Sequence, residues 1–220
     1  MGNRLSKIYT RTGDNGKTGM ADGSRVSKAD NIFTVMGDID ELNAHIGMIR
    51  ALLTTASSTK MPAPTNPTPC KISHYQHQLS IIQHLLFNIG GELAMPEYQG
   101  VKTQHIDWLE ADIDAMNAHL QPLKDFILPA GKPLTCQIHI ARTVCRRAER
   151  HAARLNEDKP NALSTTTYQF INRLSDWLFV FARLSSHTAF LATDDEQNNP
   201  SQEVLWDKNI LDNFNQSNQT

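Results

Sequence analysis

The stretch IFTVMGDIDELNAHIGMIRALL (residues 32–53) decides the fold class, because its apolar side chains recur at alternating intervals of three and four residues. Such spacing draws one continuous apolar stripe along a helix of about six turns. The same spacing returns in segments that begin near residues 75, 106, 134 and 170. Sustained helical spacing, with no useful run of strand alternation, predicts an all-α, up-down bundle of five helices.

Composition limits the classes of protein to which the chain can belong. It has 220 residues, 40% of them apolar, which suffices for one domain with a sizeable core. A net charge of -2 gives no general basic field, so we expect no nucleic-acid or membrane partner. No apolar run is long enough to span a bilayer, and the N-terminal residues contain no apolar core of a signal peptide. The three cysteines form no CxxC motif. We therefore expect a cytoplasmic location.

Composition also changes along the chain. We expect a single helical domain over residues 1–193, with an N-terminal arm (1–28) and an internal flexible linker (54–73) rich in Ser, Thr and Pro. Residues 194–220 are polar and carry a net charge of -5. This tail is expected to be mostly disordered, with Val204-Leu205-Trp206 docking on the body of the protein.

The N-terminal arm has the features of an anion-binding loop. It carries six basic residues against two acidic ones, and four glycines fall within eleven residues. Glycines let backbone N–H groups converge on an anion, so the segment TRTGDNGKTG (10–19) predicts a phosphate-binding loop. It is not a Walker A loop, because Arg11 stands where that motif needs a glycine. A flexible polar arm without a ligand is the alternative. The candidate ligand residues are Thr10, Arg11, Thr12, Gly13, Asp14, Gly16, Lys17, Thr18 and Gly19.

A row of arginines follows the apolar stripe of the fourth helix. Arginines recur at four-residue intervals from Arg142 to Arg154, and Arg147 stands beside the row. Like charges at this spacing destabilise a helix, so the row needs compensating charge. Salt bridges to the acidic residues 38–41 of the first helix would explain Arg147 and Arg154. The arginines that lie against the apolar stripe better fit a polyanion such as a nucleoside triphosphate. These are Arg142, Arg146 and Arg150.

Other candidate chemistry is limited. His74, His77 and His84 have a spacing that could bind a metal, but no cysteine or paired carboxylate joins them, so no metal site is predicted. No signature of Ser-His-Asp or Cys-His catalysis is present. The polar run 172–176 interrupts the most apolar helix, so it requires a partner or a ligand.

Five motifs, in this order, resemble the PduO-type ATP:cob(I)alamin adenosyltransferases, and the resemblance covers residues 7–190. The motifs are Tyr9-Thr10-Arg11-Thr12-Gly13-Asp14, Gly37-Asp38-Ile39-Asp40-Glu41-Leu42-Asn43, Phe126-Ile127-Leu128-Pro129, Cys145-Arg146-Arg147-Ala148-Glu149-Arg150 and Ile171-Asn172-Arg173-Leu174-Ser175-Asp176. The resemblance implies a five-helix bundle that assembles as a homotrimer with active sites between subunits. It also implies transfer of the 5′-deoxyadenosyl group of ATP to the cobalt of cob(I)alamin, with release of triphosphate. Mg²⁺ and a flavin-dependent cobalamin reductase would be the cofactor and the partner.

The resemblance also implies roles for individual residues. Residues 10–19 and Lys28 would hold the ATP phosphates, and Asp40 would pair with Arg146 across the subunit interface. Phe126 would close the lower face of the corrin. The nucleotide site would be completed by Arg146, Glu149, Arg150 and Asn172, beside Arg142 of the same row. A strongly nucleophilic cob(I)alamin needs no general base, which agrees with the missing catalytic triad. A non-catalytic sensor or carrier of ATP or adenosylcobalamin is the alternative, and the sequence does not indicate which pathway uses the product.

Overall fold

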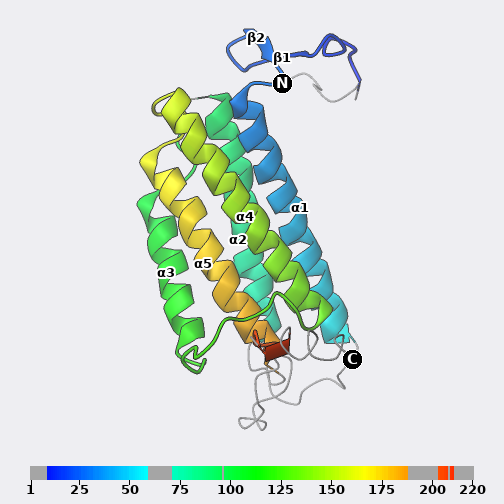
Figure 1. Cartoon of the computed structure of the whole chain (residues 1–220). Helices are drawn as coiled ribbons and strands as arrows, with labels where there is room; N and C mark the ends of the chain where they lie inside the picture. The colour runs from blue at the N-terminus through cyan, green and yellow to red at the C-terminus, as the bar shows by residue number, and fades with distance from the viewer. Residues whose placement is uncertain (1–8, 59–70, 96, 188–202, 208, 211–220) are drawn as a thin grey trace.

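The computed structural model describes residues 9–58, 71–95, 97–187, 203–207 and 209–210. Five helices run up and down side by side (Figure 1), which confirms the predicted bundle. They are α1 (Asn31–Ser58), α2 (Lys71–Ala94), α3 (Thr103–Asn117), α4 (Pro133–Asp158) and α5 (Thr165–Ser186). A short antiparallel hairpin precedes them, formed by β1 (Lys17–Gly19) and β2 (Arg25–Ser27).

The core is built from the apolar stripes that the sequence predicts. α4 packs against α1 and α5, α1 also packs against α2, and α3 packs against α5. In α5, Phe170, Trp177 and Phe181 are fully buried. Burying each such side chain contributes about 1.5–3 kcal/mol, so α5 accounts for a large share of the core. The ring of Tyr75 on α2 lies 4.8 Å from that of Phe181, which brings α2 onto the same core.

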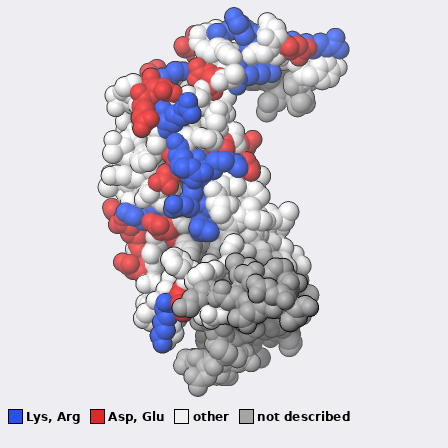
Figure 2. Space-filling model, viewed as in Figure 1, with Lys and Arg blue, Asp and Glu red and all other residues white. Residues whose placement is uncertain are grey.

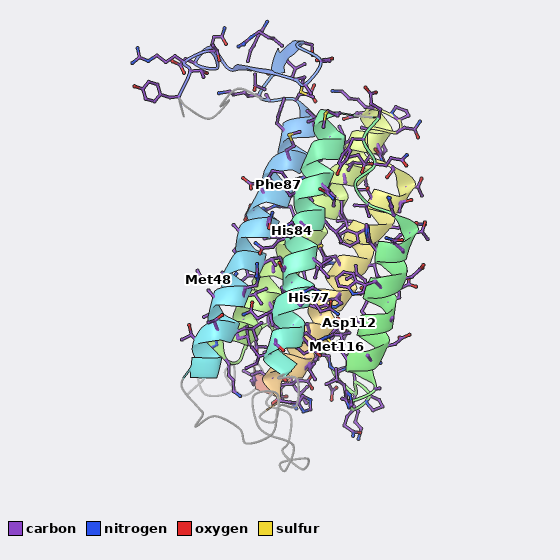
Figure 3. All side chains as sticks on the ribbon, turned by 180° about the vertical axis from the view of Figure 1, so that it is seen from behind. Met48, His77, His84, Phe87, Asp112 and Met116 are labelled. Carbon is purple, nitrogen blue, oxygen red and sulfur yellow. The ribbon has the colours of Figure 1, made fainter. Side chains whose placement is uncertain are left out.

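A buried carboxylate joins three of the helices. Asp112 of α3 accepts a hydrogen bond from the indole N–H of Trp177 at 2.6 Å. Its other oxygen lies 3.2 Å from Nε2 of His74 on α2. Figure 3, the view from behind, shows Asp112 between α2, α3 and α5. Because a buried carboxylate is costly unless it is satisfied, these contacts fix the relative placement of the three helices.

The helices extend into the predicted linker from both sides. α1 continues to Ser58 and α2 begins at Lys71, so the boundaries 54 and 73 are wrong. Thr54 and Thr55 lie inside the helix and each donate a hydroxyl hydrogen bond to a carbonyl four residues earlier, which satisfies the hydroxyl groups there. Residues 59–70 of the linker and most of the acidic tail lie outside the described residues, so their predicted disorder stays a prediction.

The loop before α4 leads the chain back toward the bundle. Gly131 has a φ of +124°, which a residue with a side chain rarely adopts. Lys132 is the N-cap of α4 and Pro133 is its first residue, a position where the missing N–H of proline costs nothing. The end of α4 that lies next to this loop is therefore set by residues 131–133.

Candidate functional site

The glycine-rich loop folds into a compact turn closed by Lys28. The backbone N–H of Lys28 donates to the carbonyl of Gly16 at 2.8 Å, at the end of the β1–β2 ladder. A Cβ atom placed on Gly13 would lie 3.0 Å from Nζ of Lys28, so this ammonium group covers the loop. The structure thus brings together Lys28 and the loop at 10–19, which the sequence paired as phosphate ligands.

Arg25 organises the same loop, and the sequence analysis did not single it out. Its guanidinium donates to the carbonyls of Thr12 at 2.5 Å and Lys17 at 3.2 Å. Gly16 and Arg11 have φ values of +78° and +59°, and such a conformation is unusual for arginine. The sequence could have pointed to Arg25, because it is a basic residue three positions before Lys28 in a glycine-rich arm. Arg25 holds the backbone of the loop, while the side chains of Arg11 and Lys17 stay exposed.

The arm is fastened to the bundle at its base. Lys159 forms an ion pair with Asp30 at 2.8 Å, and this hydrogen-bonded contact lowers the pKa of the Asp30 carboxyl. Asn31 donates to the carboxylate of Asp158 at 2.6 Å. Beyond this base the hairpin stands clear of the helices (Figure 1). Among the described residues, no hydrogen bond or ion pair joins 9–28 to α1–α5.

The arginines beside the α4 stripe are not equivalent. Arg147 donates to Asp38 at 2.9 Å and to Glu41, both on α1. These contacts, chiefly the hydrogen bond to Asp38, raise the pKa of the guanidinium. The salt bridge predicted for Arg147 is therefore confirmed. Asp40, on the same helix, remains exposed and so does Arg146.

The seam between α4 and α5 collects the other predicted nucleotide ligands. Asn172 donates to Oε1 of Glu149 at 2.6 Å, which satisfies part of the polar run in α5. Arg146 and Arg150 are four residues apart and so share one face of α4, and Arg150 donates to the backbone carbonyl of Arg146 at 2.9 Å. Figure 2 shows basic side chains gathered over the middle of this face. Glu149, Asn172 and the two arginines are thus brought together around one positive patch.

Arg142 lies deeper in the same seam. Its guanidinium lies 5.9 Å from the centre of the Phe179 ring, and its buried Nε has no hydrogen-bond partner among the described residues. Burial, and next the charge of Arg146, lower the pKa of Arg142. Both effects disfavour the charged form of the guanidinium, so an anion bound beside it would stabilise that form.

His139 is a second residue that the sequence analysis missed. It lies on α4 three positions before Arg142, it is 4% exposed, and its Nδ1 atom has no partner among the described residues. Burial, and next the charge of Arg142, lower the pKa of His139 to about 4. The ring is therefore neutral at pH 7. His139 could have been found from its spacing, because it stands three residues before Arg142 and seven before Arg146 and so lies on the same side of α4.

Phe126 belongs to the loop between α3 and α4, and the start of α4, where this loop ends, lies at the opposite end of the bundle from the arm (Figure 1). The side chain of Phe126 is 81% exposed, which leaves the ring available to a ligand. The backbone around it pairs with the C-terminal segment: Trp206 N–H donates to the carbonyl of Phe126, and Leu128 N–H to that of Val204, both at 2.8 Å. The predicted docking of Val204-Leu205-Trp206 is confirmed.

Metal-binding groups are sparse in the described part of the chain. No group of three or more His, Cys, Asp or Glu side chains there could hold a metal ion. His77 and His84 are exposed on the back of α2 (Figure 3), while His74 contacts Asp112. A Mg²⁺ ion carried by nucleotide phosphates needs only one or two protein carboxylates, and Asp14 of the loop is available. The residues present therefore fit a metal that arrives with its nucleotide.

Together these features define a class of protein. An all-helical bundle carries a glycine-rich cationic loop at one end, an arginine seam at its middle and an exposed aromatic side chain at the other end. The thiol of Cys145, on the same helix as the seam arginines, is not placed as a nucleophile, because it is buried and donates to the carbonyl of Ile171. Burial raises the pKa of its thiol. The class is thus a nucleotide-binding helical bundle that positions its ligands and neutralises their charge.

The chain belongs to the cobalamin adenosyltransferase family, whose model matches residues 8–185. It is 45% identical to a cobalamin adenosyltransferase of Cupriavidus metallidurans over 184 residues, covering 84% of this chain and 90% of the relative. It is 38% identical to a corrinoid adenosyltransferase of Mycobacterium tuberculosis over 209 residues, covering 92% and 93%.

A solved structure has the same fold. It is a variant of the PduO-type ATP:corrinoid adenosyltransferase from Lactobacillus reuteri, complexed with cobalamin and ATP. The two chains superpose with a TM-score of 0.73 at 30% identity, over 92% of this chain and 97% of that one. The resemblance to the PduO-type family inferred from five motifs is confirmed. Within the described residues, none of the helices combines the length and apolar character needed to cross a bilayer.

Proposed function

We propose that this protein transfers the 5′-deoxyadenosyl group of ATP to the cobalt of cob(I)alamin, releasing triphosphate. The observation that carries the proposal is the pairing of two cationic elements with an exposed aromatic loop in a chain of this family. The glycine loop under Lys28 offers backbone N–H groups and an ammonium to phosphates. The α4 seam adds Arg146, Arg150 and the Glu149–Asn172 pair.

In the reaction the cobalt supplies the electron pair for the new Co–C bond. The bond between C5′ and the phosphate oxygen breaks, and its pair leaves with triphosphate. The protein therefore has to hold C5′ over the cobalt and to neutralise charge on the leaving group. The arginines of the seam and Lys28 perform the second task, and Mg²⁺ on the phosphates would add to it.

Phe126 performs a separate task at the corrin. Its exposed ring would cover the lower face of the macrocycle and exclude the axial base from the cobalt. Removing that ligand raises the tendency of the metal to accept an electron, because axial ligation sets its potential. The reductase that delivers cob(I)alamin, a flavin-dependent enzyme by the family resemblance, stays a prediction, and so does the cytoplasmic location.

The separation of the arm from the seam supports a homotrimer with sites between subunits. Asp40 and Arg146 are exposed, so each is available to a second copy. The arm of one chain would lie on the α4 seam of its neighbour. We expect Arg146→Ala to lose both turnover and the trimer, which sedimentation of the purified variant would reveal. An active, fully assembled variant would contradict this role of Arg146.

The decisive assay is anaerobic, with purified protein, ATP, Mg²⁺ and chemically reduced cobalamin. Loss of the cob(I)alamin absorbance is expected, together with a light-sensitive product and triphosphate rather than diphosphate. Omitting ATP is the control for spontaneous oxidation. Tight ATP binding without turnover would contradict the transferase and indicate a sensor or carrier.

A further inference from the structure

One buried arginine has no part in the mechanism described so far. Arg183 lies in the last turn of α5, and its side chain is only 6% exposed. Its Nε donates to Oε1 of Glu203 at 2.8 Å, and its Nη2 donates to the carbonyl of Gln121 at 2.8 Å. The guanidinium therefore holds two segments that lie far apart in the sequence.

Both of these segments lead to Phe126. Gln121 lies in the loop between α3 and α4, five residues before Phe126. Glu203 begins the C-terminal segment 203–206, here called the strap. The strap pairs antiparallel with residues 126–128, with Leu205 opposite Ile127. Two hydrogen bonds join them, from Trp206 N–H to Phe126 and from Leu128 N–H to Val204.

We propose that Arg183 is a positioning residue that sets the place of Phe126 through the strap. This inference rests on the proposed function, because it assigns Arg183 a role in the same reaction. The Arg183–Glu203 pair, called the clasp, fixes the start of the strap against α5. The strap then fixes the backbone on both sides of Ile127, and with it the direction of the exposed Phe126 ring.

The strength of the clasp follows from its burial. Glu203 is 12% exposed, so both charges are largely removed from water. Such a pair is costly to break, because the buried Arg183 guanidinium would lose the carboxylate of Glu203 and keep the uncharged carbonyl of Gln121. The Phe126 ring, in contrast, is held by little packing of its own, since it is 81% exposed. Its placement therefore depends on backbone contacts of the loop, which the strap supplies.

The test begins with hydrogen exchange at two amides, those of Leu128 and Trp206. Glu203→Ala removes the clasp from the strap side and leaves the bundle helices unaltered. We expect both amides to exchange at least about tenfold faster in this variant. Asp207→Ala is the matched control, because it removes another carboxylate one residue beyond the strap. Unchanged exchange in Glu203→Ala would overturn the clasp.

Turnover supplies the second readout. Glu203→Ala is expected to lower kcat by about tenfold while leaving the KM for ATP within about twofold. In the Phe126→Ala background the same substitution should change kcat by less than about twofold, because both act through one ring. An equal loss in both backgrounds, or no loss in either, would overturn the positioning role. Arg183→Lys keeps the positive charge but loses the simultaneous hydrogen bonds to Glu203 and to the carbonyl of Gln121. It should therefore behave like Glu203→Ala.

The two readouts separate this inference from the proposed function. A parent protein without turnover would overturn the transferase, and with it the role of Arg183 in the reaction. Faster exchange at Leu128 and Trp206 would in that case still establish the clasp. Normal turnover in the parent with no kinetic change in Glu203→Ala would overturn only the inference.

Discussion

The two ends of the bundle present non-helical segments in opposite ways. At one end, residues 9–28 form a hairpin, and within the described part of the chain its hydrogen bonds and ion pairs to the bundle are those at its base, from Asp30 and Asn31. At the other end, the strap pairs with the Phe126 loop and is tied to α5 by a buried ion pair. The binding groups of the arm are therefore available to a second molecule, whereas the strap contacts residues of its own chain.

In the proposed trimer, this difference would set how the site is divided between copies. A ligand held by the arm can be shared with a neighbouring subunit, because the same-chain seam is not in contact with it. Phe126 is built into the chain that also contributes α4. If this is correct, defects in the arm and the seam should be exchangeable between subunits, and defects near the strap should not be.

The largest expected effect comes from combining two inactive variants. Lys28→Ala removes the ammonium over the glycine loop, and Arg150→Ala removes a seam cation, so each should lose at least about 100-fold in turnover. When the two are co-expressed and the mixed trimers are isolated by two tags, about one site in three should have both groups intact, because either mixed composition places one unaltered arm on one unaltered seam. Activity of the mixed trimers, measured against each parent, checks this.

The matched control combines two variants from the other end. Phe126→Ala and Glu203→Ala act on the same loop of one chain, so mixed trimers should show only the average activity of the two parents. Recovery in this second mixture would contradict the assignment of the strap to its own chain. Absence of recovery in the first would place the arm and the seam of one chain in the same site.

Phe126→Ala alone should have the next largest effect. It removes the ring that would cover the corrin, so we expect kcat to fall by about 100-fold with ATP binding unchanged. Titration with ATP by calorimetry and the anaerobic assay measure the two quantities separately. Phe126→Leu keeps an apolar side chain and should retain more activity. Normal turnover in Phe126→Ala would remove this end of the molecule from the reaction.

The seam between the two ends gives a pH-dependent prediction. Because the pKa of His139 falls to about 4 on folding, the unfolded chain binds more protons than the folded one between pH 4 and 6.5. The free energy of unfolding should therefore decrease as pH falls through this window, by about 1–2 kcal/mol after allowing for solvent near the ring.

Urea unfolding at pH 7 and pH 5 measures this slope. His139→Asn should flatten it, whereas His119→Asn, which removes an exposed ring beyond α3, should leave the slope as it is. An unaltered slope in His139→Asn would mean that the seam is more open to water than its burial indicates.

The smallest effect is expected at the base of the arm. Lys159→Ala breaks the ion pair with Asp30, which is partly exposed and so contributes only about 0.5 kcal/mol. The arm would then sample more directions, and the KM for ATP should rise by about twofold with kcat unchanged. Steady-state kinetics with Lys132→Ala as a control would detect it. A larger effect would show that the arm is more rigid than its contacts suggest.

The sequence was sufficient for the fold and for the outline of the site. The three-four spacing predicts helices because their stripes must be buried, and this holds for all five. The glycine loop was visible because phosphate binding needs glycine and cations within a few residues. Docking of Val204-Leu205-Trp206 could be predicted from an apolar group in a polar tail, but the contact that forms is backbone pairing, and the three side chains stay 39–51% exposed.

Other features of the site are contacts between residues far apart in the sequence, and these depend on the three-dimensional fold. The partner of Arg147 could be predicted only as a group of acids, because residues 38 and 41 lie on one side of α1 and residue 40 does not. Arg183 and Glu203 are twenty residues apart. Their contact depends on where the chain runs after α5, and the spacing of apolar residues does not predict this. The roles of the individual site residues remain proposals for the same reason.

The strap also places an optical probe beside the proposed corrin site. The chain has three tryptophans, and Trp206 is 51% exposed on the strap, whereas Trp177 is fully buried in the core. A corrin absorbs where indole emits, so its arrival near Phe126 should quench Trp206 by energy transfer. Comparison with Trp206→Phe would isolate this emission, and occupancy of the site could then be followed in real time without any turnover.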